Sequence, residues 1–196
     1  MPHDLKIFVV DTGPLITLAV AQSLDYLLYV DADVIVPDAV LHEATFDAGR
    51  LGAQDIIAWV KAHRSRIEIA PTRAYQVFDA ARASIPNLRE PDLGERAAVE
   101  VIEEPERLRD DERGLLLCEE TALLKRVVVR DRSRIVEVST LDFLRILEAE
   151  QRIQSAEQVF ELAEKAGRFP SRAEKMPMHD AVTRAAIQDL VKRREE

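Results

Sequence analysis

Carboxylates occur at several places where a predicted strand ends or the following helix begins. They are Asp11 after the first strand, Glu43 in the helix after the second, Glu95 after a glycine, and the pair Glu119 and Glu120 after the fourth strand. In open parallel sheets such positions face one crevice outside the carboxyl ends of the strands. Carboxylates about 4 Å apart repel one another by roughly 1 kcal/mol in water and by more at lower dielectric. We therefore expect the crevice to bind a cation.

The chemistry of these side chains restricts which cation would bind. The set offers oxygen ligands without a histidine or cysteine cluster, which suits Mg²⁺ or Mn²⁺ better than zinc. One or two such ions can generate a hydroxide and stabilise the leaving oxygen of a phosphodiester. The acids therefore indicate hydrolysis of a phosphodiester.

The elements that must position these acids are those of an α/β protein. Short apolar runs alternate with segments of helical period, which is typical of a parallel sheet covered by helices. The predicted strands are the runs 7–10, 34–36, 67–70, 115–118 and 135–138. Together they predict a central, mostly parallel sheet of about five strands.

The α/β domain is expected to end close to Gly167, because glycine suits the left-handed turn that closes a helix. We assign residues 1–168 to this domain and residues 169–196 to a linker followed by an amphipathic helix. The linker contains Pro170 and Pro177. We expect the final helix to pack on its own domain.

Composition excludes several classes of protein. The 196 residues carry a net charge of −9, which argues against loose electrostatic binding of nucleic acid. Cys118 is the one cysteine, so neither an internal disulfide nor a four-cysteine zinc site can form. Apolar runs are too short for a membrane span or a signal-peptide core. We expect a cytoplasmic protein.

Five segments together resemble the PIN-domain nucleases, which include the toxin ribonucleases of prokaryotic toxin–antitoxin pairs. The resemblance spans about residues 5–167 and depends on the order and spacing of the segments rather than on any single motif. The segments are IFVVDTGPLI (7–16), VPDAVLHE (36–43), LGERAA (93–98), LLLCEE (115–120) and VSTLDFL (138–144). It implies a PIN-like three-layer α/β/α fold, to which the C-terminal helix is an extension.

The resemblance also implies roles for the acids. Asp11, Glu43, Glu95 and Glu119 fall on catalytic positions, and Asp11, Glu95, Glu119 and Glu120 on metal ligands for Mg²⁺ or Mn²⁺. Thr12 falls on the hydroxyl that supports the site, and Asp92 is an alternative to Glu95. The family normally has aspartates after the fourth strand. The longer glutamates here are expected to shift or loosen one metal.

The partners implied by the resemblance are an RNA substrate, a second copy of the chain and a small antitoxin protein. Arg89 and Arg96 are the candidate RNA contacts closest to the predicted crevice. Arg130, Arg132 and Arg134 also fit RNA contacts, but fit a solvated charged face better. His42, although next to Glu43, is expected to be a hydrogen-bonded structural residue.

Three functions remain open on the sequence. The first is a metal-dependent endoribonuclease, which could be a toxin. The second is a catalytically weakened PIN-like module that binds RNA or docks a protein, which the pair Glu119 and Glu120 favours. The third, a phosphorylated receiver-type domain, ranks below both, because Ser139 rather than a lysine follows the fifth strand.

Overall fold

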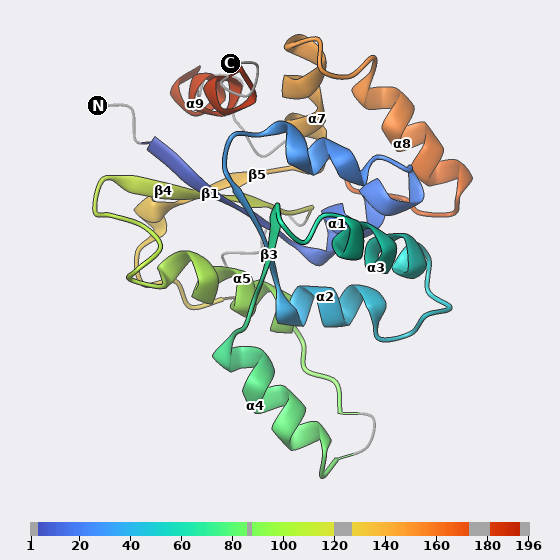
Figure 1. The fold of residues 1–196 in the computed structure, drawn as a ribbon, viewed down its shortest axis with the longest axis vertical. Helices are drawn as coiled ribbons and strands as arrows, with labels where there is room; N and C mark the ends of the chain where they lie inside the picture. The colour runs from blue at the N-terminus through green and yellow to red at the C-terminus, as the bar shows by residue number, and fades with distance from the viewer. Residues whose placement is uncertain (1–3, 86–87, 120–126, 173–180, 193–196) are drawn as a thin grey trace.

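The computed structural model describes residues 4–85, 88–119, 127–172 and 181–192, and the sheet lies at their centre (Figure 1). Its five described strands are all parallel, in the order β3-β2-β1-β4-β5. The strands are β1 (Asp4–Val10), β2 (Asp33–Pro37), β3 (Ile67–Ala70), β4 (Glu112–Leu117) and β5 (Ile135–Val138). The structure thus confirms the predicted parallel sheet.

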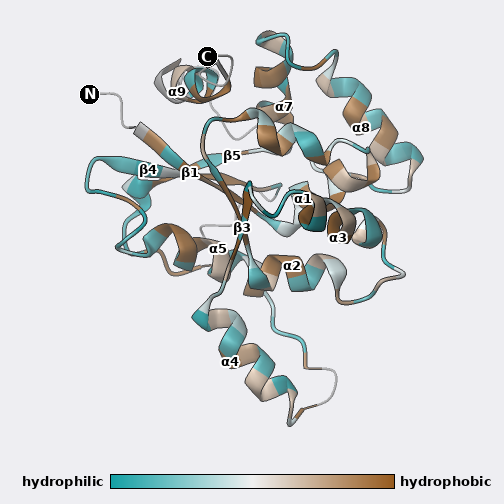
Figure 2. Cartoon of the chain, viewed as in Figure 1, coloured by the Kyte–Doolittle hydropathy of each residue, from teal (hydrophilic) through white to brown (hydrophobic). Residues whose placement is uncertain are grey.

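Strand β1 lies in the middle of the sheet and is covered on both faces. Phe8, Val9 and Val10 are fully buried, which explains why the strand is an unbroken apolar run. It begins at Asp4, earlier than the apolar run does, because Asp4 still pairs with Glu112 of β4. Hydrophobic residues accordingly concentrate where the central strands cross the molecule (Figure 2).

Helices cover both faces of the sheet and form the outer layers of the three-layer fold. The helices are α1 (Thr12–Val20), α2 (Asp38–Thr45), α3 (Ala53–Ala62), α4 (Arg73–Arg82), α5 (Leu93–Glu103), α7 (Thr140–Ala149), α8 (Ala156–Lys165) and α9 (Ala181–Lys192), with short 3₁₀ turns η1 (Leu24–Tyr29) and η2 (Arg132–Arg134). The larger core joins one sheet face to side chains of α1, α7, α8 and α9. The core on the other face is built largely around α5. Helix α4 projects from the body of the fold (Figure 1).

Several helix ends follow from local sequence signals. Ser139 accepts a hydrogen bond from the Asp142 amide at the start of α7, and Ser155 accepts one from the Gln158 amide at the start of α8. Beyond α8, Gly167 has φ of +90°, the left-handed conformation that glycine adopts without steric cost. Of these, the Gly167 turn was predicted from the sequence, and serine is a residue type that favours helix N-caps.

The sequence predicts helices that begin at Ser23 and at Glu95, and the structure differs at both. The segment after Ser23 forms the 3₁₀ turn η1 rather than an α-helix, because the Ser23 hydroxyl bonds back to the Ala21 carbonyl and β2 begins soon afterwards at Asp33. Helix α5 begins at Leu93 instead of Glu95, because Asp92 takes the left-handed conformation just before it.

The C-terminal helix α9 packs on α7 and on β1. Ile187, Leu190 and Val191 of this helix are buried in the larger core, and the Leu190 carbonyl accepts a hydrogen bond from the Asp31 amide. The extension is therefore part of the same packed body. None of the described helices has the length and apolar character that a membrane crossing requires.

Candidate active site

Asp11 lies at the carboxyl end of the central strand. It is the N-cap residue of α1, and 6% of its surface is exposed. Its amide donates a 3.0 Å hydrogen bond to the Leu117 carbonyl, which joins the end of β1 to the end of β4. The fold therefore places Asp11 at the sheet edge where the sequence predicts a crevice.

Glu43 is held at the same edge by two donors from distant parts of the chain. The Thr12 hydroxyl donates to Glu43 Oε2 at 2.9 Å, and the Gly94 amide donates to Glu43 Oε1 at 3.2 Å. A Cβ atom on Gly94 would lie only 2.7 Å from Glu43 Oε2 and 3.3 Å from Thr12 Oγ1. Glycine is thus needed at position 94 for the starts of α1 and α5 to meet at Glu43.

Glu119 lies just beyond β4, and its carboxylate is also engaged on both oxygens. Oε1 accepts hydrogen bonds from the hydroxyls of Thr17 at 2.5 Å and Thr140 at 3.4 Å. Oε2 forms a 2.8 Å ion pair with Nη2 of Arg168. A Cβ atom on Gly13 would lie 3.2 Å from Oε2, so α1 also approaches Glu119 closely. Since Gly13 follows Thr12 directly, Glu43 and Glu119 lie beside successive residues of α1.

Arg168 was not predicted as a site residue, although Gly167 signals the turn that positions it. The left-handed turn at Gly167 lets the Arg168 amide bond to the Ala163 carbonyl, at 2.9 Å, and so folds the chain back onto the end of α8. Arg168 Nε donates to the Thr17 hydroxyl at 3.3 Å. Nothing in the sequence links Arg168 with Glu119, because the contact spans 49 positions.

The other predicted site residues have different surroundings. Glu95 is half-buried in the first turn of α5, next to Gly94. Arg96 forms an ion pair with Glu90, and Arg89 is exposed. Glu120 lies outside the described residues. Asp11 and Glu119 each follow a strand at one end of the sheet. Glu43 is linked to that end through Thr12, and Glu95 lies beside Gly94, which also bonds to Glu43.

The donor atoms suit a hard divalent ion, but their arrangement does not form a complete cage. Carboxylate and hydroxyl oxygens from Asp11, Glu43, Glu95 and Thr12 are the kind of ligand that Mg²⁺ prefers. Among residues with described placement, no three histidine, cysteine or acidic side chains form a group that could hold a metal ion. The charge of Glu119 is already balanced by Arg168. The ligand atoms are therefore of the type that binds a divalent metal ion, but their positions in this structure do not form a complete metal site.

His42 has the structural surroundings that were expected for it. Arg82 Nη1 lies 3.0 Å from His42 Nε2, and the Tyr75 hydroxyl lies 3.2 Å from Nδ1. A guanidinium can only donate, so Nε2 accepts and Nδ1 carries the proton of the neutral ring. Burial, with the positive charge of Arg82, lowers the pKa of His42 below its ordinary value.

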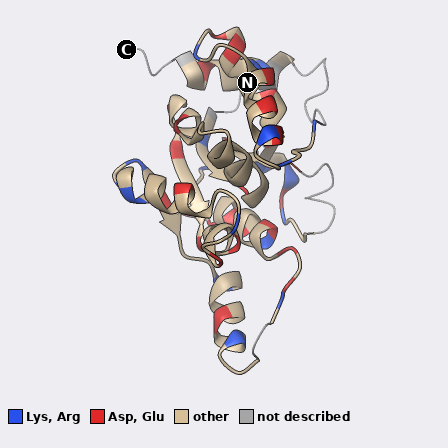
Figure 3. Ribbon diagram, turned by 90° about the vertical axis from the view of Figure 1, so that its right-hand side faces the viewer, with Lys and Arg blue, Asp and Glu red and all other residues tan. Residues whose placement is uncertain are grey.

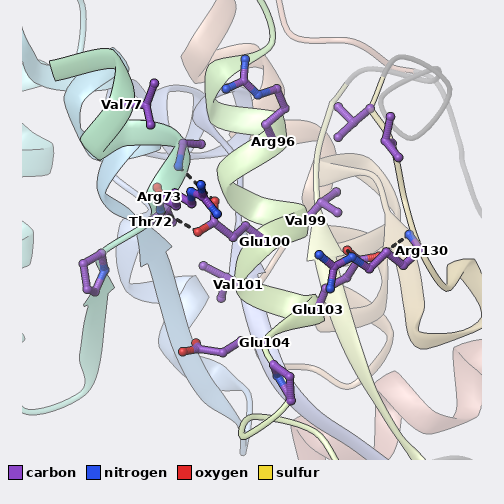
Figure 4. A pocket seen from close by; sticks show the side chains of 15 residues that line it. Thr72, Arg73, Val77, Arg96, Val99, Glu100, Val101, Glu103, Glu104 and Arg130 are labelled. Atoms are coloured by element: carbon purple, nitrogen blue, oxygen red, sulfur yellow. Dashed lines mark hydrogen bonds and ion pairs between the residues drawn. The ribbon is translucent and has the colours of Figure 1, made fainter. Parts of the chain in front are cut away.

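A pocket of about 770 Å³ lies along α5 rather than at the candidate acids. Figure 4 shows Arg96, Glu100 and Glu103 of α5 along it, with Arg73 and Arg130 on neighbouring segments. Glu100 accepts hydrogen bonds from the amides of Arg73 and Ala74, so it serves to cap α4. Of the candidate RNA contacts, Arg96 and Arg130 contribute to the described lining, which contains none of the candidate acids.

Comparison with known proteins agrees with this fold. Residues 7–113, just over half of the chain, match a family model described as a PIN domain. The chain therefore belongs to the PIN-domain family, whose members are generally metal-dependent nucleases. The matched segment contains Asp11, Glu43 and Glu95 and ends before Glu119. Searches of curated proteins and of solved structures gave no match.

Proposed function

We propose that this protein is a metal-dependent ribonuclease that hydrolyses internal phosphodiester bonds of RNA. The observation that carries the proposal is the junction of Thr12, Glu43 and Gly94 beside Asp11, within the matched PIN segment. Three segments far apart in the sequence meet there at one end of a parallel sheet. Ligands of such sheets bind at this edge.

Each acid has a proposed role. Asp11, Glu95 and Glu120 would hold Mg²⁺ or Mn²⁺. Glu119 would be a further ligand only where its ion pair with Arg168 allows an oxygen to reach the metal. Such an ion, when bound, supplies positive charge to the phosphodiester oxygens and activates water. Glu43 would be the remaining catalytic acid. Its carboxylate has a fixed orientation, because Thr12 and Gly94 each donate a hydrogen bond to one of its oxygens.

RNA binding would depend on a few local arginines. Acidic and basic residues are interspersed over the ribbon of Figure 3, and the net charge is −9. A broad electrostatic attraction for RNA is therefore unfavourable, and specific phosphate contacts are needed. We assign such contacts to Arg96 and Arg89, which lie on and just before α5. We further propose that the protein forms homodimers in the cytoplasm and that a small antitoxin protein inhibits its activity.

One observation favours a second function, a PIN-like module that binds RNA or docks a protein without cleaving. The ion pair between Glu119 and Arg168 neutralises one of the acids that the family chemistry would use. If the remaining acids cannot hold a metal productively, the fold would persist without turnover.

Cleavage of single-stranded RNA in Mn²⁺ distinguishes the two functions. Under the ribonuclease proposal the parent protein cleaves and loses this activity in a chelator, whereas Asp11→Asn does not cleave. Asp55→Asn is a matched control, because Asp55 is an exposed aspartate on α3. RNA binding without metal-dependent cleavage by the parent would support the second function. Equal cleavage by Asp11→Asn and the parent would contradict the assigned site.

A further inference from the structure

We propose that Arg168 is the resident cation of the Glu119 side of this site, an inference that rests on the proposed function. Its guanidinium takes the place that a divalent ion would need in order to bind Glu119. Metal would then be confined to the Asp11 side. Arg168 would therefore determine how many ions the site accepts.

The contacts of Glu119 leave little room for a second cation. The Glu119 side chain is 7% exposed, and contacts from Thr17, Thr140 and Arg168 together engage both carboxylate oxygens. Thr17 also accepts a hydrogen bond from Arg168 Nε, so Thr17, Glu119 and Arg168 form a closed three-membered network. An ion that coordinated Glu119 would have to displace one of these donors.

Charge balance gives the same result. One carboxylate and one guanidinium compensate each other, and a guanidinium stays charged at every pH at which proteins are stable. A divalent ion added beside Arg168 would place two further positive charges against a partly buried cation. Such repulsion is strong where the surroundings exclude water. Metal binding at Glu119 is therefore disfavoured as long as Arg168 is present.

The backbone around Arg168 is held in place by the fold. It directly follows the left-handed turn at Gly167, and α8 is anchored by the buried residues Val159, Phe160 and Ala163. Its side chain is 30% exposed, so most of it lies within the protein. The cation therefore remains at Glu119 in the absence of substrate or metal.

Mn²⁺ titration by calorimetry and by thermal shift tests the proposal without measuring RNA cleavage. Arg168→Gln should gain one Mn²⁺ per chain, or bind Mn²⁺ about tenfold or more tightly, because one unit of opposing charge has been removed. The double variant Arg168→Gln with Glu119→Gln should lose this gain. Arg172→Gln is the matched control, since Arg172 follows on the same segment but pairs with Glu157 and Glu164 at the surface.

Equal stoichiometry and affinity in the parent and in Arg168→Gln would overturn the proposal, as would a gain that survives Glu119→Gln. If Arg168→Gln does not fold, Arg168→Met replaces it, because methionine keeps the apolar stem without the charge. The proposed function fails by a separate result, the absence of metal-dependent RNA cleavage by the parent protein. The two tests therefore distinguish an incorrect role for Arg168 from an incorrect enzyme.

Discussion

Thr12 donates a 2.9 Å hydrogen bond to Glu43 across 31 positions of the sequence. The bond joins the first residue of α1 to the last turn of α2 and orients an acid of the candidate site. Removing one hydrogen bond of this kind costs about 1 kcal/mol of stability. Its functional effect should be larger, because catalytic geometry tolerates little displacement.

Thr12→Val should therefore reduce RNA cleavage by about tenfold or more while changing the free energy of unfolding by only about 1 kcal/mol. Cleavage rates and urea denaturation provide the two measurements. Thr45→Val is the control, since Thr45 lies on α2 but bonds only to the Leu41 carbonyl within that helix. An unchanged rate in Thr12→Val would remove Thr12 from the site.

Gly94→Ala should displace Glu43, because the new methyl group would lie 2.7 Å from its Oε2 atom. We expect strong loss of cleavage, with a smaller loss of stability as the flexible carboxylate moves aside. Gly49→Ala is the comparison, because its Cβ would meet only the end of the exposed Asp47 side chain, at 3.3 Å. Full activity in Gly94→Ala would show that the orientation of Glu43 is not required.

Removal of Arg168 alone should destabilise the protein, because it leaves the buried Glu119 charge without its partner. For Arg168→Met we expect a loss of about 2 kcal/mol, below the range for fully buried pairs because part of Arg168 contacts solvent. Adding Glu119→Gln should restore part of this loss in a double-mutant cycle. Additive losses in urea denaturation would mean that the two residues are not energetically coupled.

Stability should fall as pH decreases below the ordinary pKa of His42, 6.5. The pKa of His42 is lower in the folded protein, so the unfolded chain binds a proton first and gains stability relative to the fold. The contribution of neutral His42 to the free energy of unfolding is complete above pH 6.5. It is lost as the pH falls through the lowered pKa of His42 in the folded protein. Thermal melting between pH 5 and pH 8 should show less of this decline in His42→Gln. An NMR titration of the His42 ring with a midpoint above the ordinary value would contradict the prediction.

Truncation of a buried side chain on α9 should destabilise the whole fold, because this helix shares the larger core. Leu190 is buried there, and Leu190→Ala should cost about 2–5 kcal/mol. A single cooperative melting transition at lower temperature is the expected result. Arg184→Ala, on a half-buried position of the same helix, serves as the comparison. Unchanged stability in Leu190→Ala would mean that α9 detaches freely in solution.

The sequence predicts this fold well where a local pattern determines the structure. Strands β3 and β5 match their predicted ranges exactly, because each apolar run is enclosed by polar or turn-forming residues. Strand boundaries that depend on pairing with a neighbouring strand were less predictable. Strand β4, for example, begins at Glu112, where it pairs with Asp4 of β1. The order of the strands depends on contacts between distant segments, which the hydrophobic period does not encode.

The candidate site was likewise predicted from the sequence only in part. Strand ends predicted the edge at which Asp11, Glu43 and Glu119 lie, because parallel strands deliver their carboxyl ends to one side. The partners of these acids were harder to find. Gly94 and Arg168 act through distances set by tertiary packing, so their spacing in the sequence carries no signal for the contact. The assignment of metal ligands remains a prediction.

The position of Arg168 after α8 also bears on the order in which the protein is made. A ribosome completes the segment matched by the PIN family long before it reaches residue 168. Until then, Glu119 has no guanidinium beside it. A chain that ends before residue 168 would lack the balancing charge at Glu119. Synthesis beyond the segment matched by the PIN family is thus needed before the charge of Glu119 can be balanced.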